Sequence, residues 1–360
     1  MSGTNSVQVS DYYFHLPKNR IAFYPPRQRD QARLLRLVRA TGQISHHQFS
    51  DLPDLLLPKD LVVLNDTKVF PARLIGKRIS KNRGQENPTA YSQAPIEVLL
   101  IKPIKDNCWE TLVKPGKKIR IGDRLLFGEG RLEGKVLEQG EKGLRKIQFK
   151  CQGDFHSIID QVGQVPLPPY INRPTEDLDW SRYQTIYAKK RGSVAAPTAG
   201  LHFTPEIFFR LKEKKITSCT VTLHIGQGTF RPISSQKLEN HRLEKESFEI
   251  TPPVYHSIRT ARNKHQRIIA VGTTVTRTLE SAFSKQGFLP SLKGETDLFI
   301  FPGFSFNCVD VLITNFHLPN STLLMLACAF AGRDFIFQAY QEAIDKGYRF
   351  YSYGDCMLIE

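Results

Sequence analysis

Short apolar runs that end in small or polar residues recur along the chain and, after residue 166, alternate with helical patterns. Such runs lie at 61–66, 268–272 and 311–316. Helices are expected after Thr204, whose hydroxyl suits an N-cap, from Thr273 and from Ser321, and the aromatic segment 348–353 is expected to be the last strand. This alternation of strand and helix predicts an α/β domain that binds its ligands at the ends of its strands.

The pattern changes between residues 72 and 156, where short β-branched or alternating segments are separated by glycine-rich turns. The expected strands are 72–79, 96–102, 109–116, 123–128, 133–140 and 144–150. Strands at this spacing are typical of a small barrel. The sequence therefore predicts a mixed α/β domain over residues 1–71 and 157–360, with a small β-barrel domain inserted over residues 72–156.

The chain is basic, with a formal net charge of +15 and a pI of about 9.5. This balance favours a polyanionic partner, with nucleic acid first and an acidic membrane surface second. Residues 71–156 hold 18 Lys and Arg against 10 Asp and Glu, a net +8. We therefore expect the barrel to dock on a phosphate backbone through Lys114, Lys117 and Lys118, the alternative being a barrel that is merely well solvated.

The composition also indicates the compartment. The six cysteines are far apart and form no C-x-x-C pair, as in reduced cytosolic proteins. The first ten residues are polar and lack the apolar core of a signal peptide, and the apolar run at 323–331 is too short to span a bilayer. We expect a cytoplasmic, soluble protein and take a monomer as the default state.

A loop of small residues at 192–200 directly precedes His202 and the helix start at Thr204. Glycines and small side chains let the backbone approach a ligand closely, although a tight structural turn has the same composition. Five similar loops follow strands or apolar runs, at 65–67, 222–230, 271–280, 314–326 and 351–355, and another small-residue loop lies at 301–304. If these loops meet at one edge of the sheet they form a polar pocket, in which His202, His224 and His317 would titrate near neutrality.

Several chemistries lack their motifs. The chain has no H-E-x-x-H, no paired Cys/His spacing and no acidic calcium loop, so no metal is expected. It also lacks a P-loop and a G-x-S-x-G elbow. Two alternatives stay open: an amidase or esterase that uses Ser193 as nucleophile with one of the histidines, and a non-catalytic RNA-binding protein that acts through the barrel.

Blocks along nearly the whole chain, from Tyr12 to Ile359, strongly resemble the S-adenosylmethionine:tRNA ribosyltransferase-isomerase family of queuosine biosynthesis. They are VVLNDTKVFPARL (62–74), YQTIYAKKRGSVAAPTAGLHFT (183–204), TLHIGQGTFRPI (222–233), VGTTVTRTLESA (271–282), TNFHLPNSTLLMLACAFAG (314–332) and YRFYSYGDCMLI (348–359). The resemblance implies an α/β domain with an inserted six-stranded β-barrel. It also implies transfer and isomerisation of the ribosyl group of S-adenosylmethionine onto 7-aminomethyl-7-deazaguanine at the wobble position, in a tRNA anticodon stem-loop. The products would be epoxyqueuosine-tRNA, adenine and methionine.

Residue roles follow from this chemistry as expectations. His202 and His224 would be the acid/base pair, with His317 third and Glu246 positioning the substrate amine. The expected substrate contacts are Tyr183, Ser193, Thr198, Phe203, Thr229, Arg277, Asn315 and Asp355, with Arg277 on the methionine carboxylate. The family's Met-His-Ser-Glu run is replaced here by residues 243–246, Leu-Glu-Lys-Glu. The role of its histidine therefore does not carry over, unless His241 substitutes for it.

Overall fold

The computed structural model describes residues 8–79, 91–226, 228, 233, 238, 241–283 and 292–360. The chain divides into two compact units. The sheet unit comprises Met1–Lys68, Pro169–Arg173 and Ser181–Glu360, and the barrel unit comprises Val69–Pro168 and Pro174–Trp180. The domain boundaries at 71 and 156 stay a prediction, because compactness alone does not define an independently folding domain.

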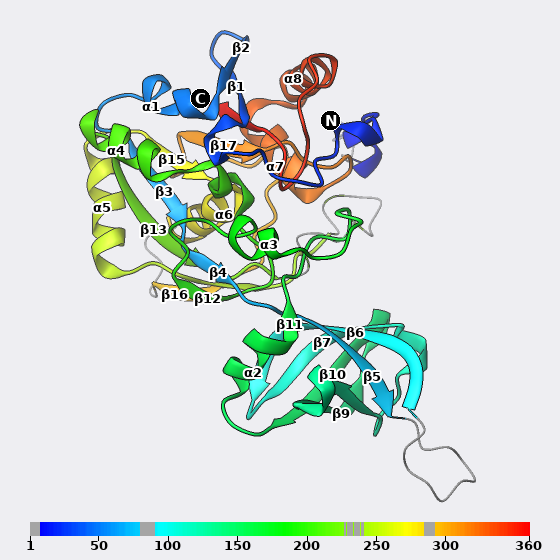
Figure 1. Ribbon diagram of the computed structural model, residues 1–360. Helices are drawn as coiled ribbons and strands as arrows, with labels where there is room; N and C mark the ends of the chain where they lie inside the picture. Colours follow the sequence, from blue (N-terminus) through cyan, green and yellow to red (C-terminus); the bar gives the residue numbers. More distant parts are fainter. Residues whose placement is uncertain are drawn as a thin grey trace, which may run out of the picture. The chain divides into compact units, whose positions relative to one another are not determined.

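A nine-stranded mixed sheet forms the centre of the sheet unit (Figure 1), in the order β16-β14-β13-β3-β15-β17-β18-β1-β2. The four central strands β13, β3, β15 and β17 run parallel, and β17 pairs antiparallel with β18. The carboxyl ends of the four parallel strands therefore share one edge, where α/β proteins bind ligands. The strand bounds are β1 Arg33–Val38, β2 Gln43–Gln48, β3 Leu61–Asn65, β13 Thr217–Leu223, β14 Glu246–Glu249, β15 Ile268–Val271, β16 Lys293–Thr296, β17 Val311–Asn315 and β18 Cys356–Ile359.

Helices cover both faces of this sheet. In β3, Val62 and Leu64 pack into one hydrophobic cluster while Leu61 and Val63 pack into another on the opposite face. This two-sided burial explains why the run is continuously apolar rather than alternating. The first cluster receives α1 (Leu52–Leu55) and α4 (Pro205–Glu213), and the second receives α5 (Pro252–Asn263), α6 (Thr273–Ala282), α7 (Thr322–Ala331) and α8 (Arg333–Asp345).

The barrel unit contains a closed six-stranded antiparallel barrel (Figure 1). Strands β5, β6, β7, β10, β9 and β8 pair in that order, and β5 pairs again with β8 to close the ring. Closure depends on Gly76, because a Cβ there would lie 2.3 Å from the carbonyl oxygen of Leu126. The bounds are β5 Arg73–Ile79, β6 Tyr91–Lys105, β7 Cys108–Lys114, β8 Arg124–Phe127, β9 Leu132–Gln139 and β10 Leu144–Cys151. The predicted fold class, α/β with a small six-stranded β-barrel, is confirmed.

Five further strands and helices belong to the described chain. The strand β4 (Thr67–Val69) pairs with β12 (Lys190–Ser193), and β11 (Gly163–Gln164) pairs with β5. The helices α2 and α3 span Phe155–Val162 and Asp177–Arg182. Most predicted elements are confirmed, including the N-cap at Thr204, whose hydroxyl accepts from the Ile207 N–H. The predicted strand at 348–353 is wrong. That segment is irregular, and the final strand β18 begins at Cys356. The sequence also gave no sign of the β1–β2 hairpin.

Candidate active site

A cavity of ≈ 380 Å³ lies at the carboxyl edge of β15 and β17. Its walls come from the loops 196–199, 272–274, 314–321 and 351–352, with Val9, Tyr170, Ile225, Ile233 and Leu323. Five of the loops singled out in the sequence therefore meet at one site, as expected: 192–200, 222–230 through Ile225, 271–280, 314–326 and 351–355. The loops 65–67 and 301–304 do not line it. Among the described lining residues there is no Asp, Glu, Lys or Arg side chain.

Asn315, at the end of β17, is the centre of the polar wall. The Thr198 hydroxyl donates to Asn315 Oδ1 at 2.8 Å, and Asn315 Nδ2 lies 3.3 Å from Nε2 of His202. An amide N–H can only donate, so His202 accepts at Nε2 as a neutral ring. Thr198 and Asn315 line the cavity, whereas His202 lies behind them. The three residues form a hydroxyl–amide–imidazole chain that leads away from the cavity.

Two of the three predicted histidines do not titrate near neutrality, so that expectation is wrong for them. Burial lowers the pKa of His202 to about 4 and that of His317 to about 3. A buried imidazolium loses its hydration, and no carboxylate among the described residues compensates for that loss at either ring. His317 lines the cavity, and its Nε2 lies 2.8 Å from the Thr314 hydroxyl. Both rings are neutral at pH 7.

The third histidine, His224, does not line this cavity. Its Nδ1 lies 2.8 Å from the Thr67 hydroxyl, and its ring lies so close to Gly192 that a Cβ there would come within 2.7 Å of it. Burial lowers the pKa of His224, partly offset by the nearby Asp66 carboxylate. Gly192 is therefore needed for close packing against this ring.

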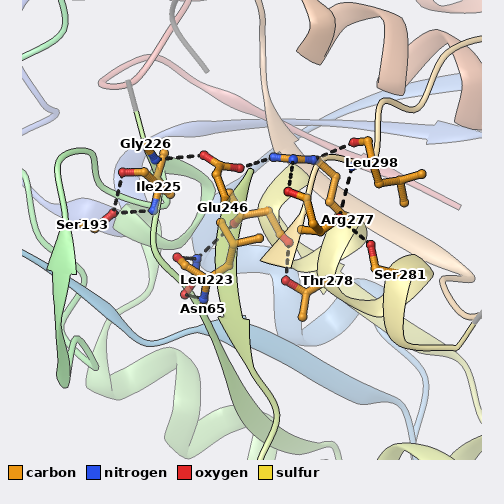
Figure 2. A network of polar contacts seen from close by, with 12 residues as sticks. Asn65, Ser193, Leu223, Ile225, Gly226, Glu246, Arg277, Thr278, Ser281 and Leu298 are labelled. Atoms are coloured by element: carbon orange, nitrogen blue, oxygen red, sulfur yellow. Dashed lines mark hydrogen bonds and ion pairs between the residues drawn. The ribbon is translucent and has the colours of Figure 1, made fainter. Parts of the chain in front are cut away.

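Glu246 and Arg277 form a buried ion pair in the network of Figure 2. Each side chain is about 5% exposed. The other Glu246 oxygen accepts from the Gly226 N–H at 2.9 Å, and Arg277 Nε donates to the Leu298 carbonyl, also at 2.9 Å. Neither residue lines the cavity. A contact of Arg277 with the methionine carboxylate, or of Glu246 with the substrate amine, would require this pair to open.

Ser193 and Asp355 connect chain segments. The fully buried Ser193 hydroxyl donates to the Ala195 carbonyl at 2.8 Å. It also accepts from the Ile225 N–H at 2.9 Å (Figure 2). A hydrolase nucleophile must reach its substrate, so this placement argues against the amidase or esterase alternative. Asp355 accepts from the backbone N–H groups of Arg33 and Arg349, at 2.9 and 2.8 Å.

The remaining predicted site residues are dispersed. Phe203 is fully buried against Phe49, with ring centroids 5.1 Å apart, and does not line the cavity. Tyr183 is 1% exposed and packs edge-on against Tyr353. Thr229 lies outside the described residues. Lys114, Lys117 and Lys118 are exposed on the barrel, at the end of β7 and in the following 3-10 turn.

Sequence reasoning missed part of the aromatic and hydroxyl lining. Tyr351, Thr273 and Thr274 fall in loops that had been singled out, but their residue types gave no reason to choose them. Tyr170 reaches the cavity from a segment that carried no signal at all.

Within the described chain no cluster of three His, Cys, Asp or Glu is placed to hold a metal ion. No single described helix is long and apolar enough to cross a membrane; only α7 and α8 taken together, bent by 114°, meet those criteria.

Comparison with known proteins agrees with this fold. The family model described as "Queuosine biosynthesis protein" matches residues 9–359. S-adenosylmethionine:tRNA ribosyltransferase-isomerases from Desulfitobacterium hafniense and Halothermothrix orenii are 47% and 48% identical to this chain, over 98% of it and 100% of each relative. The crystal structure of S-adenosylmethionine tRNA ribosyltransferase from Thermotoga maritima superposes with a TM-score of 0.54 at 37% identity, covering 98% of this chain and 100% of that one. The chain belongs to the queuosine biosynthesis protein family.

Proposed function

We propose that this protein transfers the ribosyl moiety of S-adenosylmethionine to 7-aminomethyl-7-deazaguanine at the wobble position of tRNA and isomerises it to give epoxyqueuosine-tRNA. Adenine and methionine are the released products. The observation that carries the proposal is identity of 47% over 98% of the chain to an enzyme of that name. The cavity of ≈ 380 Å³ supports it, because pockets for small molecules begin at roughly 300 Å³.

The chemistry requires a base for C5′ of the ribose, a proton for the departing adenine, and exclusion of water. The sulfonium acidifies the C5′ hydrogens, so a neutral base suffices. Of the three candidate histidines, only His317 lines the cavity, and its ring is neutral because burial lowers its pKa to about 3. We assign it the C5′ proton. The imidazolium that forms is a strong acid, which favours passing a proton on to adenine.

Thr198 and Asn315 are assigned to substrate hydrogen bonds. Both residues line the cavity, and their side chains are already oriented by the hydrogen bond between them. His202 is assigned a positioning role, because it accepts from Asn315 and so orients the amide from behind. In this assignment His202 touches no substrate, and its replacement is expected to raise KM for S-adenosylmethionine more than it lowers kcat.

The barrel is proposed to contact the anticodon stem-loop through Lys114, Lys117 and Lys118. The 3-10 turn that carries Lys117 and Lys118 is held in place by Arg145, which is 3% exposed and donates to the carbonyl oxygens of Gly116 and Ile119. Within the described residues no carboxylate pairs with this guanidinium. Exposed Lys117 and Lys118 on this turn, with Lys114 just before it at 3.9 Å from Glu97, suit a phosphate backbone.

The deciding experiment is adenine release from S-adenosylmethionine, with tRNA that carries or lacks 7-aminomethyl-7-deazaguanine. Release is expected only with the modified tRNA. Release without it, or none from folded protein, would contradict the proposal; salt-sensitive tRNA binding without release would instead favour a binding protein. Charge reversal of Lys114, Lys117 and Lys118 should lower the slope of log binding constant against log salt concentration for tRNA by about one per lost phosphate contact. The matched controls are Lys135→Glu and Lys150→Glu on other strands, which should leave this slope unchanged.

We further propose that the protein works in the cytoplasm as a monomer. All six cysteines are free thiols, which suits a reducing compartment. Sedimentation at micromolar concentration tests the monomer, and a stable dimer would contradict it.

A further inference from the structure

Two tyrosines form a stacked pair on the wall of the cavity. The rings of Tyr170 and Tyr351 lie with centroids 4.5 Å apart and planes inclined by 22°, and both residues line the cavity. The Tyr170 hydroxyl is hydrogen-bonded to the Ser352 hydroxyl and accepts from the Ser352 N–H at 3.3 Å. The contacts with Ser352 therefore fix the Tyr170 ring, against which Tyr351 stacks. The two tyrosines belong neither to the Thr198–Asn315–His202 chain nor to the Glu246–Arg277 ion pair.

Tyr351 is held in a backbone conformation that its side chain disfavours. Its φ is 73°, in the left-handed region where a bulky residue costs about 1–3 kcal/mol and glycine costs little. Its N–H donates to the Phe316 carbonyl at 3.1 Å, and its own carbonyl accepts from the Gly354 N–H at 2.9 Å. Strained residues of this kind cluster at ligand sites, where the side chain is needed in spite of its backbone.

The rest of the lining indicates what this aromatic surface binds. Small residues such as Ala196, Ala199 and Gly272 leave room for a planar group. No Lys or Arg side chain is among the described lining residues, so this described part of the wall offers no cation for the phosphates that flank a tRNA base. Of the two bases in the reaction, the adenine of S-adenosylmethionine therefore fits better than the deazaguanine of the tRNA.

We propose that Tyr351, backed by Tyr170, is the surface on which the adenine ring of S-adenosylmethionine stacks. This inference rests on the proposed function. Stacking between a base and an aromatic side chain contributes about 1–3 kcal/mol, which corresponds to a change in Kd of roughly 5- to 150-fold. The ring fixes the position of adenine before its bond to the ribose breaks.

The test measures S-adenosylmethionine binding by calorimetry without tRNA, so that no turnover occurs, together with tRNA affinity and the thermal unfolding midpoint. Tyr351→Leu and Tyr351→Gly should each weaken S-adenosylmethionine binding at least fivefold and leave tRNA affinity unchanged. Tyr351→Phe keeps the ring and should bind within about twofold of wild type. Tyr351→Gly relieves the backbone strain, so it should unfold at a higher temperature than Tyr351→Leu. Tyr24→Leu, at a tyrosine that is 47% exposed and does not line the cavity, is the matched control.

The inference is overturned if folded Tyr351→Leu and Tyr351→Gly bind S-adenosylmethionine like wild type, or if they lose tRNA binding instead. If neither variant folds, Tyr170→Leu serves the same purpose, since it removes the ring behind Tyr351, and unchanged binding there would also overturn the inference. Failure of the proposed function is a separate result: wild-type protein would then release no adenine in the presence of modified tRNA.

Discussion

Replacing one partner of the Glu246–Arg277 pair distinguishes a structural role from a role in binding. Both side chains are about 5% exposed, so Arg277→Met leaves a carboxylate in a buried site with the Gly226 N–H still donating to it. Loss of one partner from a buried pair costs about 3–5 kcal/mol, because the other charge stays buried and uncompensated. Glu246→Gln should lie near the lower end of that range, since Arg277 keeps its bonds to the Leu298 and Thr296 carbonyls.

The assay is urea unfolding of wild type, Arg277→Met, Glu246→Gln and the double variant Glu246→Gln/Arg277→Met. Removing both charges should cost clearly less than the sum of the single losses, with a coupling energy of about 2 kcal/mol or more. A purely structural role of the pair is refuted if Arg277→Met lowers the free energy of unfolding by less than about 1 kcal/mol while KM for S-adenosylmethionine rises strongly. That result would restore Arg277 as the ligand of the methionine carboxylate.

Three further predictions concern the histidines, Ser193 and Arg145. Burial lowers the pKa of His202 to about 4 and of His317 to about 3, whereas unfolded histidines titrate near 6.5. Between pH 6.5 and 4 the unfolded chain therefore binds more protons than the folded protein. The free energy of unfolding should fall by about 1.4 kcal/mol for each histidine with every pH unit that the pH is lowered. Urea titrations that show no such dependence on pH would contradict this. Ser193→Ala should lower the free energy of unfolding in urea by about 1–3 kcal/mol, because it leaves the buried Ile225 N–H without the hydroxyl that accepts its hydrogen bond. Labelling of Ser193 in the wild type by a fluorophosphonate probe would be inconsistent with its burial. Arg145→Met should weaken tRNA binding without changing the affinity for S-adenosylmethionine, and equal tRNA affinity in filter binding would argue against its part in ordering the basic loop.

The local pattern of the sequence determined much of the architecture. The apolar run at 61–65 reads as a strand buried on both faces, and β3 is one. Each of the six expected strands between residues 72 and 150 is found in the barrel. Family-specific blocks near strand ends led to the family and to five loops that line the cavity. These signals are local, because periodicity, caps and turns depend on neighbouring residues.

Only the tertiary structure decided the rest. The segment 348–353 is rich in aromatic residues and so suggests a strand. Instead, the rings of Tyr348 and Phe350 pack in the core against Phe316, and the φ of 73° at Tyr351 is incompatible with an extended strand. Arg277 and Glu246 are 31 residues apart, and the sequence around each of them does not predict that they form an ion pair. The histidine titrations depend on how deeply the folded chain buries each ring. Charge pairing and desolvation are set by residues distant in sequence, and therefore no local pattern records them.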